Sequence, residues 1–125
     1  IVAVLAGRGT PSYREHVVRV HRATAASALY RAAQYLETLD GAPPAALPDA
    51  LAQAPPDGHA VYRLTLGRPD GDDSPVSYEL AATPLDTGPM RDDACGTFTL
   101  RSDGTKGNAG SEGVDEPGAV CWGLR

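Results

Sequence analysis

A long stretch without glycine or proline, Tyr13–Leu39, constrains the fold of this chain more than any other feature. Thr10 and Pro11 stand just before it and suit the cap and the first position of a helix. Small and apolar residues recur in it at spacings of three and four, which predicts one packing face. These residues are Val17, Val20, Thr24, Ala28, Ala32, Tyr35 and Leu39. The sequence therefore predicts a helix over Pro11–Leu39, about 40 Å long, which would extend beyond a sheet of short strands.

The chain after this helix has the composition of turns and short strands. Most of its 14 glycines and 11 prolines follow residue 40. Residues 40–58 are expected to form a connection with a short helical turn around Pro48–Gln53. Alternating apolar and polar residues then predict three strands. The expected strands are His59–Leu66, Val76–Ala82 and Thr97–Arg101, and the glycine-rich Ser102–Gly118 is expected to be an ordered loop.

Two cysteines, Cys95 and Cys121, are the only ones in the chain. They form no C-x-x-C pair, and two thiols alone cannot complete a zinc site. A disulfide is the simpler interpretation, and it would stabilise the domain by about 3.5 kcal/mol in the chain-entropy model. It would also place the domain in an oxidising compartment. The alternative is two unrelated buried thiols in a cytosolic protein.

The net charge of −5 conceals an asymmetry between the two parts of the chain. Residues 1–39 carry five arginines against Glu15 and Glu37, whereas the remaining residues are strongly acidic. One interpretation is a solubilising charge distribution. The other is that the basic segment meets the acidic part of another copy. An acidic surface repels phosphate, so the composition as a whole does not favour nucleic-acid binding.

No pattern in the sequence indicates catalysis or a bound cofactor. His16 and His21 point in different directions on a helix and cannot chelate one metal. Gly7-Arg8-Gly9 is too short for a phosphate loop, and no serine stands in a Gly-x-Ser-x-Gly turn. The acidic stretch Asp70–Ser74 lacks the distal glutamate of a calcium loop, so it is interpreted as a hairpin tip. The chain is therefore expected to be neither an enzyme nor a metal or cofactor protein.

Several segments resemble type IV pilins. Thr10–Val17 is similar to the Pro-Ser-Tyr segment where the helix of these pilins leaves the bilayer, and Ala28–Gln34 is similar to their Ala-Leu-x-x-x-Ala-Gln run. The sequence Cys-Gly-Thr-Phe-Thr-Leu at 95–100, Gly-Thr-Lys-Gly at 104–107 and Cys121-Trp122 resemble the ending of PilE-type minor pilins. The resemblance covers the helix and the last part of the chain.

This resemblance implies an α+β pilin-like fold. A long N-terminal helix would pack on an antiparallel sheet of three or four strands, with a C-terminal loop closed by Cys95 and Cys121. Residues 11–125 would be the globular domain, divided into helix 11–39, connection 40–58, and sheet with disulfide-bounded loop 59–125. Residues 1–10 would be the end of a longer hydrophobic helix or an appended segment.

The function implied by the resemblance is that of a structural subunit, a minor pilin that enters or initiates a type IV pilus. Its partners would be other pilin subunits and, through the preceding hydrophobic helix, the inner membrane of a Gram-negative bacterium. The globular domain would be periplasmic before assembly and extracellular afterwards. The residues expected to mediate assembly lie on the helix: Tyr13, Val17, Val20, Thr24, Ala28 and Ala32.

Two alternatives remain open. ComP-like pilins are DNA-uptake receptors, and here Arg91, Arg101 and Lys106 would be the candidate DNA contacts near the disulfide. Six carboxylates in the same region weigh against that function: Asp92, Asp93, Asp103, Glu112, Asp115 and Glu116. The second alternative is a pseudopilin of type II secretion, a family whose major subunits usually lack this cysteine pair.

Overall fold

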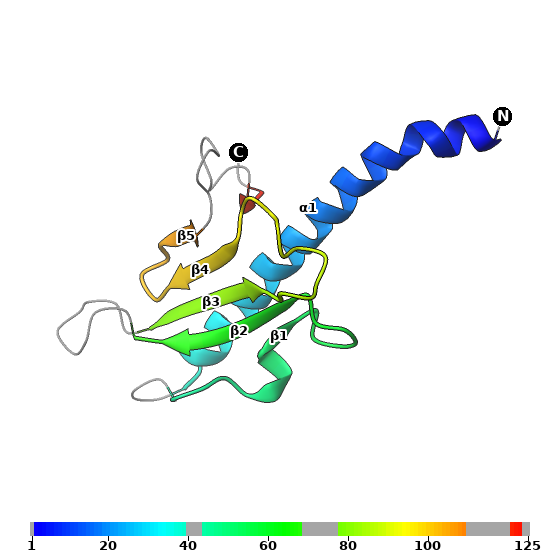
Figure 1. Cartoon of the computed structure of the whole chain (residues 1–125). Coiled ribbons are helices and arrows are strands. Elements are labelled where there is room, and N and C mark those ends of the chain that lie inside the picture. The colour runs from blue at the N-terminus through cyan, green and yellow to red at the C-terminus, as the bar shows by residue number, and fades with distance from the viewer. Residues whose placement is uncertain (1, 40–43, 69–77, 110–120, 124–125) are drawn as a thin grey trace.

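The computed structural model describes residues 2–39, 44–68, 78–109 and 121–123. Its longest element is the helix α1, Val2–Glu37 (Figure 1). The helix begins at Val2 rather than at the predicted Pro11, which lies inside it. A proline inside a helix removes one backbone donor and crowds the carbonyl four residues earlier, which disfavours a helix but does not always end it, and the alanines and leucine of the preceding segment favour helix. Figure 1 shows the N-terminal half of α1 extending beyond the sheet, as the sequence predicts.

One face of α1 packs on the sheet, and it is rotated from the predicted face. The buried helix residues are Ala25, Ala26, Ala28, Leu29, Ala32 and Leu36. Ala28 and Ala32 were predicted correctly, whereas Val20 is 47% exposed and Leu39 is 36% exposed. Successive helix residues are about 100° apart, so the predicted set follows one flank of the face that is actually buried. The alanines on the buried face allow the helix backbone to approach the sheet closely.

Within the described residues, five antiparallel strands form a single sheet in the order of the chain. They are β1 Gln53–Ala54, β2 Tyr62–Gly67, β3 Glu79–Pro84, β4 Thr97–Arg101 and β5 Lys106–Ala109. A 3-10 turn, η1 Asp49–Leu51, precedes β1 and confirms the short turn predicted there. The three predicted strands correspond to β2, β3 and β4, and the boundaries of β4 are those predicted. At two residues, β1 is too short to show a period in the sequence.

The prediction of a loop over Ser102–Gly118 is wrong for β5, which pairs with β4 along its whole length. The sequence Lys-Gly-Asn-Ala has no alternation of apolar residues that would indicate a strand. Its pairing depends on close approach to β4. Gly107 stands opposite Thr99, and a Cβ atom at position 107 would lie 2.8 Å from Thr99 Oγ1. The later part of that stretch, from residue 110, lies outside the described residues, as does the acidic stretch Asp70–Ser74.

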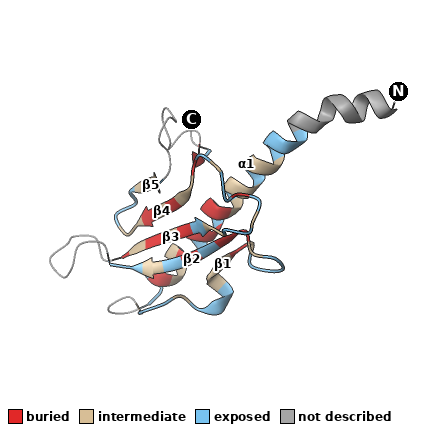
Figure 2. Cartoon of the chain, viewed as in Figure 1, coloured by how far each residue is buried: buried red, intermediate tan, exposed pale blue. Residues whose placement is uncertain are grey.

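The core lies between α1 and one face of the sheet (Figure 2). The sheet contributes alternate residues of each central strand, which confirms the inward face predicted for them. The buried residues of these central strands are Tyr62, Leu64, Leu80, Ala82, Phe98 and Leu100. Near the end of α1, Tyr78 Oη donates a hydrogen bond to Glu37 Oε1 at 2.8 Å. Burial, together with this bond, raises the pKa of Tyr78 to about 12, so its hydroxyl remains a donor at neutral pH.

Candidate functional site

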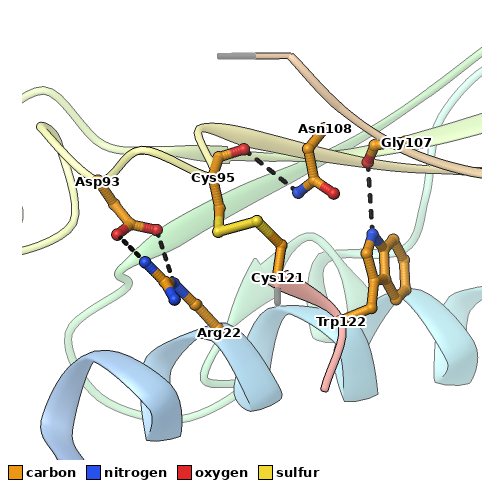
Figure 3. Close-up of a disulfide and its surroundings, with 7 residues drawn as sticks. All are labelled: Arg22, Asp93, Cys95, Gly107, Asn108, Cys121 and Trp122. Carbon is orange, nitrogen blue, oxygen red and sulfur yellow. Dashed lines mark hydrogen bonds and ion pairs between the residues drawn. A yellow bond between two sulfur atoms is a disulfide. The ribbon is translucent and has the colours of Figure 1, made fainter. Parts of the chain in front are cut away.

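The predicted disulfide between Cys95 and Cys121 is present, and it organises one end of the molecule (Figure 3). Both cysteines are buried, and the bond holds Cys121 against the segment that leads into β4. Asn108 Nδ2 donates to the backbone oxygen of Cys95 at 3.2 Å. Trp122 Nε1 donates to the backbone oxygen of Gly107 at 3.4 Å. The edge strand β5 is thereby hydrogen-bonded to residues on both sides of the disulfide.

An ion pair fastens α1 to the segment before Cys95. Arg22 Nη2 lies 2.6 Å from Asp93 Oδ1, and Arg22 Nε lies 3.0 Å from Asp93 Oδ2. The two side chains are only 18% and 8% exposed, respectively. The hydrogen bond to the carboxylate raises the pKa of Arg22, against the opposing effect of burial. The pair is bidentate, the geometry in which arginine and carboxylate hold each other most firmly (Figure 3).

Sequence reasoning missed this pair. It counted Asp93 among the acidic residues that would weigh against DNA binding and gave Arg22 no partner. The two residues are 71 positions apart, and neither has a neighbour that indicates its partner. In the structure each neutralises the other, so Asp93 adds little to the negative potential around the disulfide.

A row of aromatic side chains runs from the core to the surface beside the disulfide. Tyr62, Phe98, Trp122 and Tyr30 contact one another edge to face, with successive ring centroids 5.9, 5.4 and 5.8 Å apart. The row ends at Tyr30, which is 42% exposed. Burial raises the pKa of Tyr62, whose hydroxyl oxygen is buried without a hydrogen-bond partner among the described residues.

The ammonium group of Lys106 lies over the exposed end of this row. It is 5.7 Å from the ring centroid of Tyr30 and 5.9 Å from that of Trp122. These distances are those of cation–π contacts, which hold a lysine in place without consuming its hydrogen-bond donors. No carboxylate among the described residues pairs with this lysine. Within the part of the chain that the structure describes, its N–H donors have no carboxylate acceptor.

The three candidate DNA contacts do not form one site. Lys106 lies on the face of the sheet that α1 covers, beside Tyr30. Arg101, at the end of β4, donates to Glu79 Oε2 at 2.8 Å. Arg91 lies in the segment that precedes the other end of β4, with its Nε 3.4 Å from Asp92 Oδ2. The two arginines and the lysine therefore do not form one continuous basic stripe.

A narrow cleft lies between α1 and the C-terminal residues that follow the disulfide. It has a volume of about 130 Å³ and is lined by Arg19, Arg22, Ala23, Cys121, Trp122 and Gly123. Arg19 also lines an adjoining groove, together with Arg14 and Glu15. We name the surface formed by Arg19, Tyr30, Lys106 and Trp122 the basic–aromatic flank of α1. Sequence reasoning missed three of its members, although Arg19 and Tyr30 are spaced to lie on one side of a helix.

The six residues predicted to mediate assembly are divided by the structure. Ala28 and Ala32 are buried in this chain, against its own sheet. Tyr13 is 68% exposed and Val20 is 47% exposed, while Val17 and Thr24 are partly exposed. These four residues lie on a different side of α1 from the basic–aromatic flank. We name them the apolar flank, and their part in assembly remains a prediction.

The described residues contain no cluster of histidine, cysteine, aspartate or glutamate that is suited to a metal ion. His16 and His21 belong to no such cluster. Over the same part of the chain, no helix combines the length and the hydrophobicity that crossing a membrane requires.

One comparison with known protein families gives a match. Residues 11–99 match the family described as type IV minor pilin ComP, DNA uptake sequence receptor. The matched range covers more than half of the chain and runs from the projecting part of α1 into β4. It includes Cys95 and the Arg22–Asp93 pair. A search of curated proteins found no match.

Proposed function

We propose that this chain, which belongs to the type IV minor pilin ComP family, is a subunit of a type IV pilus that binds extracellular DNA for uptake. Membership identifies a pilin rather than an enzyme. The observation that carries the proposal is the family match over residues 11–99, whose description names a DNA-uptake receptor. It reverses the order of the two functions favoured by the sequence, in which a purely structural subunit came first.

The charge distribution of the described residues is compatible with this function, despite the net charge of −5. Asp93 is neutralised by Arg22, so one of the carboxylates that would otherwise repel DNA contributes little repulsion. On and beside α1, several cations have no carboxylate partner among the described residues. They are Arg14, Arg19, Arg31 and Lys106. Phosphate groups attract such unpaired cations, and DNA binding would release the counterions around the phosphates.

Assembly into the filament is the second part of the proposal. The exposed tyrosine and valines of the apolar flank would contact neighbouring pilin subunits, because apolar side chains on a projecting helix gain free energy when they are covered. The inner membrane would hold the subunit in the periplasm before assembly, and the pilus would then display it outside a Gram-negative cell. Burial of Ala28 and Ala32 in the chain's own core leaves Tyr13, Val17, Val20 and Thr24 for these contacts.

A selection from random duplexes tests DNA binding and identifies the recognised sequence in the same experiment. The purified domain is incubated with the pool of duplexes, and the bound fraction is amplified over several rounds. We expect one short sequence to be enriched, and fluorescence anisotropy should show tighter binding to it than to a scrambled duplex of equal length. Binding should weaken as salt rises, with a slope in log K against log salt of roughly −0.9 per phosphate contacted.

The control for this experiment is the same domain with its disulfide reduced, which tests whether binding requires the native fold. Enrichment of no sequence, together with no measurable binding to any duplex at low salt, would leave only the structural role in the pilus.

A further inference from the structure

The two sides of α1 differ in chemistry. The apolar flank presents Tyr13 and Val20 as large exposed apolar side chains, and Arg31 lines the same groove as Val20 and Thr24. The basic–aromatic flank presents unpaired cations next to aromatic rings. Apolar surface suits contacts between subunits, whereas cations interleaved with aromatics suit nucleic acid, because phosphates bind the cations and bases or sugars pack on the rings. The division implies that one side of α1 can face the filament while the other side binds a ligand.

The basic–aromatic flank is a continuous surface. Arg19 and Trp122 line the same cleft, Trp122 contacts Tyr30, and the ammonium group of Lys106 lies over both rings. The disulfide and the hydrogen bond from Trp122 to Gly107 fix the position of the indole ring (Figure 3). The two rings and the Lys106 ammonium group therefore form a preorganised surface, and the exposed Arg19 lies at its end.

The length of this flank is suited to a nucleic-acid backbone. Arg19 and Tyr30 are eleven positions apart, which on a helix is about 16 Å. That distance equals the axial rise of roughly five base pairs of B-form DNA at 3.4 Å each. Arg19 at one end of this span and Lys106, which lies over Tyr30 at the other, can therefore contact two separate backbone phosphates.

We propose that DNA lies along the basic–aromatic flank, with Arg19 and Lys106 on backbone phosphates and the exposed ring of Tyr30 against a sugar or base. This inference rests on the proposed function and specifies where on the chain the DNA binds. Two carboxylates among the described residues of this region are engaged in other contacts. Asp93 is paired with Arg22, and Glu37 accepts the hydrogen bond of Tyr78. Glu15 lines the groove beside Arg19, so DNA on this path would pass close to that carboxylate.

The open face of the sheet is a poorer candidate. Its outward residues are mostly threonine and alanine, which carry no charge. Arg101 on this face is paired with Glu79. Arg63 is exposed there and stands on the opposite side of the sheet from α1. It provides a matched control, because its removal changes the net charge by the same amount as the loss of Arg19 or Lys106.

The test compares Arg19→Ala, Lys106→Ala and Arg63→Ala in anisotropy titrations with a fluorescent duplex and with its single strand. We expect Arg19→Ala and Lys106→Ala each to weaken binding roughly three- to tenfold at 0.1 M salt, and to reduce the salt slope by about 0.9. Tyr30→Ala should weaken binding further than Tyr30→Phe, and Arg63→Ala should change affinity less than twofold. The form of DNA that the wild-type domain binds with the higher affinity shows whether the flank binds duplex or single-stranded DNA.

Thermal unfolding of each variant separates loss of binding from loss of fold. Arg19→Ala serves here as the main variant, since Arg19 is exposed and alanine is a good helix former.

If the wild-type domain binds DNA but Arg63→Ala weakens DNA binding as much as Arg19→Ala and Lys106→Ala do, the flank is not the site and the receptor function stands. If the wild-type domain binds neither form of DNA, the proposed function fails and this inference with it.

Discussion

Replacing Cys121 with serine is expected to lower the free energy of unfolding by about 3–4 kcal/mol in an oxidising buffer. The bond joins residues 26 positions apart and so limits the conformations of the unfolded chain. It also holds Trp122 in the aromatic row and, through Gly107, supports the edge strand β5. Equilibrium unfolding in urea, followed by circular dichroism, measures the change.

Two further measurements make the cause of that loss clear. A double variant, Cys95→Ala and Cys121→Ala, removes the bond without adding a buried hydroxyl group, and it should lose a similar amount of stability. Wild-type protein in a reducing agent should unfold like the double variant. An unfolding midpoint of Cys121→Ser equal to that of oxidised wild-type protein would contradict the structural role of the disulfide.

Asp93→Ala is expected to destabilise the domain by about 2 kcal/mol, because it leaves the charge of Arg22 without its partner in a largely buried position. Fully buried pairs typically lose about 3–5 kcal/mol in this way, and the smaller figure allows for the 18% exposure of the arginine side chain. The same urea unfolding experiment measures the effect.

The chain offers a matched control in the pair Arg91–Asp92, whose side chains are 61% and 91% exposed. Asp92→Ala should change stability by less than about 0.5 kcal/mol, as is usual for exposed ion pairs. Replacing both partners of the buried pair, as Arg22→Met with Asp93→Leu, should restore much of the stability lost in Asp93→Ala. Equal effects of Asp92→Ala and Asp93→Ala would show that the buried pair does not fasten α1 to the disulfide segment.

The main architecture could be predicted from the sequence because it follows from periodicity and composition. The lack of glycine and proline over Tyr13–Leu39 predicts the helix, and alternation predicts the three central strands. The disulfide follows from there being only two cysteines. Both edge strands escaped prediction for a physical reason: an edge strand such as β5 is held by backbone hydrogen bonds to β4, and these leave no trace in side-chain periodicity.

The candidate site was less predictable because it is made by tertiary contacts. Nothing local to Arg22 indicates Asp93, and nothing local to Lys106 indicates Tyr30 and Trp122. The predicted packing face of α1 is rotated by part of a turn from the observed one. Alanines are common on both sides of this helix and give a weak hydrophobic signal. A sum of the charges near the disulfide overestimates the negative potential there, because Asp93 is neutralised by Arg22 of the helix.

DNA uptake and pilus formation, measured together in the organism that encodes this chain, test the central claim most directly. A strain that lacks the gene is complemented with the wild-type gene or with the double variant Arg19→Ala and Lys106→Ala. Surface pili and the uptake of labelled DNA are counted in the same cultures. The receptor function predicts that the strain without the gene loses uptake even where it still forms pili, and its placement on the flank predicts that the double variant forms pili but fails to restore uptake. Normal uptake in a piliated strain that lacks the gene would contradict the receptor function, whereas a double variant as effective as the wild type would contradict only the placement on the flank.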